Sequence, residues 1–130
     1  MSLLAINLSE VQDQQPVPAG EYRLELKKCN VKKSKKSDNH YINAMYIIEG
    51  EKDAPPVFDM VIIPDDSQEY KSLFERRMKD FYEAHGLPLD GSEVDLEAIE
   101  GNSIEAILSE EEASDDNEAC NRIKRYILPA

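Results

Sequence analysis

Six lysines and no acidic residue lie between Lys27 and Lys36 of this chain. Ammonium groups donate strong hydrogen bonds to phosphate oxygens, so a dense run of lysines can form a phosphate-binding surface. The chain as a whole has a formal net charge of −12, but charges more than about 10 Å away are largely screened at ordinary salt. The local field therefore decides whether a polyanion binds. The residues expected to contact phosphates are Lys28, Lys32, Lys33, Lys35 and Lys36; the alternative is a solvated turn without a ligand.

Aromatic side chains on the expected strands could provide surfaces for base stacking, since every base has a π-face. The candidates are Tyr22, Tyr41, Tyr46, Phe58 and Tyr126. Aromatic residues at strand spacing belong mostly to the core, and among these we favour Tyr41 and Tyr46 for stacking. They lie five residues apart, so at most one faces the groove unless the strand is bulged. Tyr126 is expected to share a face with Arg122 and Lys124, which would make a second basic and aromatic strand.

The other polar residues form no pattern for catalysis or metal binding. His40 and His85 are far apart and belong to no ligand motif. The acidic segment Glu110–Glu118 lacks the spacing of a calcium loop. The sequence has no nucleophile motif, no phosphate-cradling glycine-rich loop and no zinc-deaminase motif. We therefore expect no enzymatic activity, no cofactor and no metal, and a solvated face for helix cations such as Arg77.

Length and composition bound the class of protein. With 130 residues, 41% hydrophobic and 32% charged, the chain is expected to form one soluble domain, residues 21–130, after an extended lead-in, residues 1–20. We expect no secretory signal and no membrane span. Two distant cysteines suit a reducing cytoplasm. Between Glu83 and Glu118 there are 13 acids and no Lys or Arg, which argues against binding DNA through bulk charge.

The apolar spacing predicts the elements that must position these residues. A strand from Glu21 alternates through Tyr22, Leu24 and Leu26, and its apolar phase then slips by one, which predicts a bulge near Lys27–Lys28. A polar hairpin loop is expected over residues 32–40. The remaining expected elements are strands over 40–49 and 57–63, a helix from after Ser67 to Gly86, a short helical turn over 95–100, and strands over 103–109 and 120–128.

The resulting order is three strands, a helix and two strands. It predicts a mainly β protein with a five-stranded OB-fold-like barrel, in which the helix lies between the third and fourth strands. The bulge in the first strand favours closure of such a barrel. The second expected strand is apolar on both faces, so one face needs a cover, and a homodimer could provide it.

With these elements in order, the chain resembles a family of small bacteriophage single-stranded-DNA-binding proteins, OB-fold accessories of replication or recombination. The resemblance covers nearly the whole chain from Val17. The segments that carry it are Pro18–Tyr22, Lys32–Asn39, Val57–Asp59, Phe81–Leu87, Leu96–Gly101 and Asn121–Pro129.

The resemblance implies a cytoplasmic protein of a phage-infected bacterium that binds single-stranded DNA and acts beside replication or recombination proteins. The chain departs from the pattern in two places. Asp38 stands where the family commonly has a glycine, which adds an acid beside the phosphate path. Its acidic segment lies before the last strand, whereas single-stranded-DNA-binding proteins often have an acidic C-terminal tail, so recruitment of partner enzymes by such a tail is in doubt.

Sequence-tolerant binding of single-stranded DNA is thus the leading hypothesis, with lysines on phosphates and tyrosines on bases. The alternative is an acidic protein-interaction module that docks a basic replication or defence factor without contacting DNA. A metal-dependent enzyme is the weakest reading, because the chain has no cluster of ligand residues.

Overall fold

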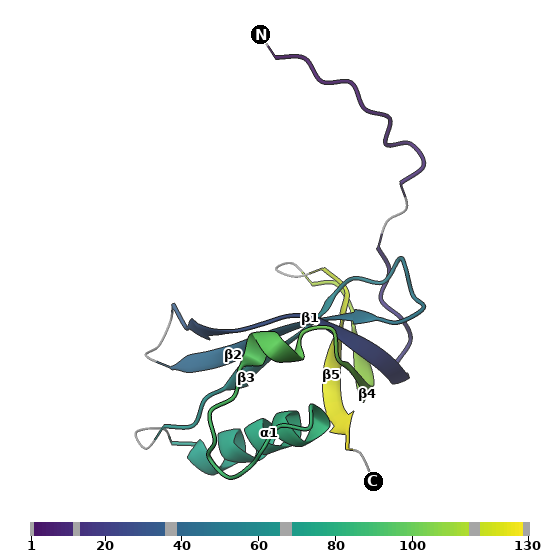
Figure 1. Ribbon diagram of the computed structural model, residues 1–130. Coiled ribbons are helices and arrows are strands. Elements are labelled where there is room, and N and C mark those ends of the chain that lie inside the picture. Colours follow the sequence, from purple (N-terminus) through teal and green to yellow (C-terminus); the bar gives the residue numbers. More distant parts are fainter. Residues whose placement is uncertain (1, 12–13, 36–38, 66–68, 115–117, 129–130) are drawn as a thin grey trace.

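The computed structural model describes residues 2–11, 14–35, 39–65, 69–114 and 118–128. They form a five-stranded antiparallel sheet with the order β3-β2-β1-β4-β5, one α-helix and one short 3-10 helix (Figure 1). The elements are β1 Gly20–Lys33, β2 His40–Ile48, β3 Val57–Ile62, α1 Lys71–Ala84, the 3-10 helix η1 Leu96–Ile99, β4 Ser103–Glu111 and β5 Cys120–Ile127.

The sheet curls into a nearly closed barrel because the two halves of the long, bulged strand β1 pair with different strands. Residues 20–25 of β1 pair with β4, and residues 24–33 pair with β2. The register shifts between Leu26 and Lys28, which confirms the expected bulge. The far edges of the sheet meet where Tyr126 of β5 donates a hydrogen bond to Asp59 of β3. With α1 between β3 and β4, the OB-like fold predicted from the sequence is confirmed.

The core is filled by the inward side chains of all five strands and by Phe81 of α1. In β2, for example, Ile42, Ala44, Tyr46 and Ile48 are buried while the residues between them are not. The helix lies across one end of the barrel (Figure 1), where the fully buried Phe81 joins the strand residues.

The last part of the N-terminal lead-in is bound to the barrel. Val17 is buried, and its backbone N–H and C=O both bond the side-chain amide of Asn121 on β5, at 2.9 Å and 2.8 Å. The backbone N–H of Gln15 also donates to the carbonyl oxygen of Asp53, at 2.9 Å. Residues 2–11, by contrast, extend away from the barrel (Figure 1).

The expected element bounds differ from the structure mainly at the lysines. β1 continues to Lys33, which pairs with His40, and the backbone N–H of Ser34 still donates to Asn39. Lys32 and Lys33 therefore belong to a strand, because backbone pairing with β2 overrides the weak strand propensity of lysine. The helix begins at Lys71; Ser67 lies outside the described residues.

Candidate nucleic-acid interface

The outer face of β1, β2 and β3 brings cationic, apolar and aromatic side chains into register. Side chains directly opposite one another on paired strands lie on the same face. The pairing therefore gives three rows across the strands, which are Lys28–Met45–Phe58, Asn30–Asn43–Met60 and Lys32–Tyr41–Ile62. Lysines lie at the β1 end of the two outer rows, apolar and aromatic side chains make up the rest of those rows, and two asparagines lie between them in the middle row.

One groove lies at the hairpin end of this face. Its volume is ≈ 670 Å³. Tyr41, Met60 and Ile62 make its apolar part, and the cations beside them are Lys32, Lys33 and Lys35. We call it the lysine groove. A base could contact its apolar residues while its phosphate meets an ammonium group.

A second groove of ≈ 450 Å³ continues from the first between β3 and β5. We call it the arginine groove, because Arg77 of α1 and Arg122 of β5 line it together with Phe58 and Met60. Met60 lines both grooves, so the two adjoin. Together they form a trough along β2 and β3, the face with which OB folds bind oligonucleotides.

The charges that line the trough are mostly positive. Five cations and one acid are among the lining residues, and the acid, Asp59, binds Arg77 with an Nη2–Oδ1 distance of 2.9 Å. Just outside, Glu111 of β4 binds the Nε atom of Arg122 at 2.7 Å. Both partners of this second pair are about half exposed, so the pair is weak and a phosphate could compete for Arg122.

The structure brings together most of the cations expected from the sequence. Lys28 and Lys32 lie on the outer face, Lys33 and Lys35 line the lysine groove, and Arg122 lines the arginine groove. Lys124 is exposed at a bulge in β5 and does not line either groove. Lys36 lies outside the described residues.

Tyr41 and Tyr46 lie on opposite faces, as their spacing requires. Tyr41 is on the outer face and lines the lysine groove. Tyr46 is fully buried at 0% exposure, and its hydroxyl lies 2.8 Å from His85 Nε2. The choice of Tyr46 as a stacking residue was therefore wrong, because its phase along β2 places the ring inside the barrel.

Tyr126 is not positioned as a partner of Arg122 and Lys124. The register of β5 shifts at Lys124, so that Ile123 pairs with Leu108 but Arg125 pairs with Ile107. This bulge changes the phase of the strand, and the Tyr126 ring packs against the core in a T-shaped contact with Phe81. The expected basic and aromatic strand does not form, because the bulge at Lys124 places Tyr126 and Arg122 on opposite faces of β5.

A network of hydrogen bonds beneath the trough connects β2, β3, β5 and α1. Tyr126 donates to Asp59 Oδ2, and the Tyr126 and Tyr46 hydroxyls lie 3.4 Å apart. Tyr46 in turn meets His85, while Arg77 binds the other oxygen of Asp59. Burial raises the pKa of Tyr46 and of Tyr126, so both hydroxyls stay protonated. This hydrogen-bond network holds Arg77 at the edge of the arginine groove.

His85 makes the free energy of unfolding of the protein depend on pH. Burial lowers the pKa of His85 from 6.5 to about 4. Between pH 6.5 and 4, the unfolded chain takes up a proton on this imidazole that the folded protein does not. Above pH 6.5, we expect the contribution of His85 to the free energy of unfolding to be constant. As the pH falls below 6.5, the free energy of unfolding should decrease by up to about 1.4 kcal/mol per pH unit.

Urea unfolding at pH 7.5, 6.5 and 5.5 measures this effect, since most carboxylates remain ionised over that range. His85→Gln is the matched control, because glutamine can still bond Tyr46 but does not titrate. The variant should lose the decline between pH 6.5 and 5.5. Equal declines in both proteins would mean that His85 does not cause it.

Two trough residues were missed by the sequence reasoning. Met60 is 58% exposed and joins the two grooves, and Arg77 was expected to be a solvated helix cation. The sequence did contain a signal for Met60. It alternates in β3 with the inward residues Val57, Asp59 and Val61, and an apolar residue on the outer face of a strand is a candidate for contact with a ligand. Nothing local to the helix indicates that Arg77 meets Asp59.

The described part of the chain contains no cluster of three or more His, Cys, Asp and Glu residues that could hold a metal ion. Cys29 and Cys120 are both free, and burial raises the pKa of the Cys29 thiol to about 11. No helix among the described residues has the length and apolar character needed to cross a membrane.

Fold and site together define an OB-like barrel protein with a basic, partly apolar trough on the outer face of β1–β3. The chain belongs to the family described as "Protein of unknown function (DUF669)", whose model matches residues 5–128. No curated protein matches the chain.

Proposed function

We propose that the protein binds single-stranded DNA along the trough, with little dependence on base sequence. The observation that carries this proposal is the register of β1, β2 and β3, which sets Lys28 and Lys32 in the same rows as Phe58 and Tyr41. Single-strand binding needs this combination of cations for the phosphates and flat or apolar groups for the bases. Duplex DNA presents its bases stacked and paired, so the apolar part of the trough would stay unused.

The trough also explains how a protein with a net charge of −12 can bind a polyanion. Its cations adjoin one another over β1–β3, α1 and β5, and the acid among its lining residues, Asp59, binds Arg77. The resemblance to phage single-stranded-DNA-binding proteins supports a role in phage DNA replication or recombination, in the cytoplasm of the infected bacterium. The role is non-enzymatic and requires no cofactor.

We expect Lys32→Ala with Lys35→Ala to weaken binding of a fluorescent oligo-dT and to reduce its salt dependence. Each phosphate contact on a single strand contributes about 0.7 to the slope of log affinity against log salt. Losing two contacts should therefore lower the slope by about 1.4 and the affinity roughly 25-fold at 0.1 M salt. Fluorescence anisotropy over a salt series measures both quantities.

The matched control is Lys52→Ala with Lys79→Ala, which removes the same charge from residues that line other surfaces. It should leave the slope unchanged. Equal losses in the two double variants would mean that bulk charge, and not the trough, binds DNA. No binding by the wild-type protein at low salt would favour the protein-interaction module.

A further inference from the structure

Two apolar surfaces of the protein lie outside the trough, and each lacks a cover among the described residues. The first is the N-terminal arm, residues 2–8, which extends away from the barrel (Figure 1). Leu3, Leu4, Ile6 and Leu8 are between 60% and 90% exposed, and the arm contains no charged side chain. Exposed apolar residues that follow one another in this way are typical of an interaction segment.

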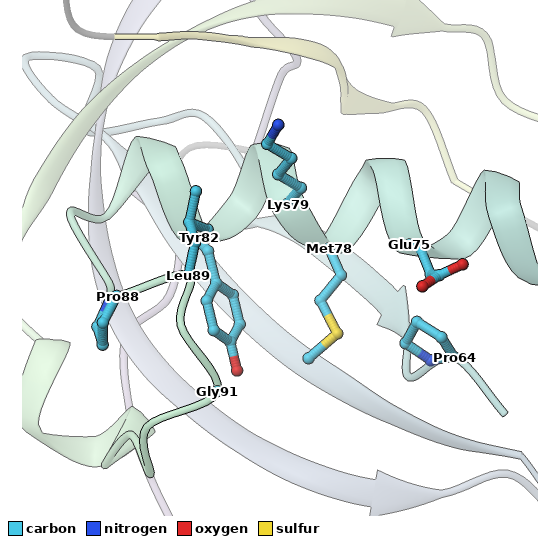
Figure 2. A pocket seen from close by; sticks show the side chains of 8 residues that line it. All are labelled: Pro64, Glu75, Met78, Lys79, Tyr82, Pro88, Leu89 and Gly91. Carbon is cyan, nitrogen blue, oxygen red and sulfur yellow. The ribbon is translucent and has the colours of Figure 1, made fainter.

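The second surface is a groove on α1 of ≈ 560 Å³ (Figure 2). Met78 and Tyr82 project from the helix toward the segment that carries Leu89, and Pro64 lies beside Met78. Glu75 and Lys79 are the charged residues among its lining, and they have opposite signs. We call this the helix groove. Most of its lining is apolar, and apolar grooves are surfaces on which apolar segments of partner chains dock.

The arm is held at a point that directs it away from its own helix groove. Its anchor is formed by Gln15, which bonds Asp53 in the β2–β3 turn, and by Val17, which bonds Asn121 at the start of β5. Residues 2–11 lie on the side of the barrel opposite α1 (Figure 1). An extended arm of seven residues, 2–8, spans roughly 23 Å, so it can reach a neighbouring molecule.

We propose that the helix groove binds the N-terminal arm of a second copy of this chain. The uncharged apolar arm suits a groove whose lining charges cancel, and reciprocal exchange of two arms closes a dimer by a two-fold axis. The trough lies on the outer face of β1–β3 and shares no lining residue with the helix groove. The dimer therefore leaves both troughs free, and this inference does not depend on DNA binding.

Analytical ultracentrifugation of the full chain over a concentration series tests the exchange. The wild-type protein should sediment as a concentration-dependent dimer. Leu3→Ser with Leu4→Ser and Ile6→Ser should sediment as a monomer, and so should Leu89→Asp. Leu73→Asp is the matched control, since Leu73 and Leu89 are equally exposed at 54% and 55% but Leu73 does not line the groove; this variant should remain dimeric.

Mixing the two monomeric variants separates arm exchange from other causes. The arm variant retains an intact groove and the Leu89→Asp variant retains an intact arm, so an equimolar mixture should form a heterodimer with one arm–groove contact. Circular dichroism of each variant checks that the barrel is folded. A monomeric wild-type protein, a dimer that survives the arm substitutions, or a mixture that stays monomeric would each overturn the proposal.

Discussion

Replacing Asp59 by alanine is expected to lower the free energy of unfolding by about 3 kcal/mol. Asp59 is 5% exposed and accepts hydrogen bonds from both Arg77 and Tyr126. Its removal leaves the Tyr126 hydroxyl without its acceptor and a guanidinium without its counter-charge. Removal of one partner from a fully buried ion pair costs about 3–5 kcal/mol. We place the value at the lower end because the Arg77 side chain is 46% exposed.

Urea unfolding at pH 7.5 measures this change, with Asp80→Ala as the control. Asp80 is an exposed carboxylate on α1, so its loss should alter the free energy by no more than about 0.5 kcal/mol. The Asp59 variant should also bind oligo-dT more weakly, because Arg77 is then no longer held at the arginine groove. A loss of stability below about 1 kcal/mol would show that the contact between β3 and β5 does not depend on this carboxylate.

Replacing Tyr41 and Phe58 together by alanine is expected to weaken binding of oligo-dT at least 30-fold, since each stacked base contributes about 1–3 kcal/mol. Both residues lie on the outer face and line different grooves of the trough. The salt slope should stay unchanged, because no cation is removed. This combination of lost affinity and constant slope distinguishes a stacking contact from a phosphate contact.

Tyr70→Ala with Leu73→Ala is a suitable control. It removes a ring and an aliphatic side chain that are 60% and 54% exposed, similar to the 51% of Phe58, but that do not line the trough. Anisotropy at several salt concentrations should show wild-type binding for this variant. If both double variants bind equally well, the bases do not stack on the outer face of β2 and β3.

Local patterns in the sequence were enough to predict the fold. Alternation marked the strands, Gly86 marked the end of the helix, and the slip of the apolar phase after Leu26 marked the bulge in β1. The same reasoning placed Lys28, Lys32, Lys33, Lys35 and Tyr41 at one surface. Each of these inferences depends on neighbours within a few residues, which is the range over which the strand and helix periods can be read.

The parts of the site that were not predicted depend on contacts between distant segments. Arg77 meets Asp59 only because α1 crosses the end of the barrel beside β3. Tyr126 turns into the core because of a second bulge, at Lys124, and the polar alternation around that residue conceals the change of phase. β2 has apolar residues in both phases, so the sequence does not tell which of its faces is the inner one. The burial of Ile42, Ala44 and Ile48 shows that Tyr46, in the same phase, faces the interior.

The bulge at Lys27 makes the number of residues in this part of β1 more restrictive than their identity. Lys27 is the extra residue of the bulge, because Leu26 pairs with Tyr46 and Lys28 pairs with the next residue of β2, Met45. Deleting Lys27 would therefore leave Lys28 on the outer face and Cys29 inside, since strand side chains alternate with a period of two, but it would remove the bend that a bulge gives a strand. Substitutions at position 27 should be tolerated, whereas deletion of this residue should straighten β1 and weaken the closure of the barrel. Natural variation in this segment, where it occurs, is therefore expected to exchange side chains while keeping the chain length fixed.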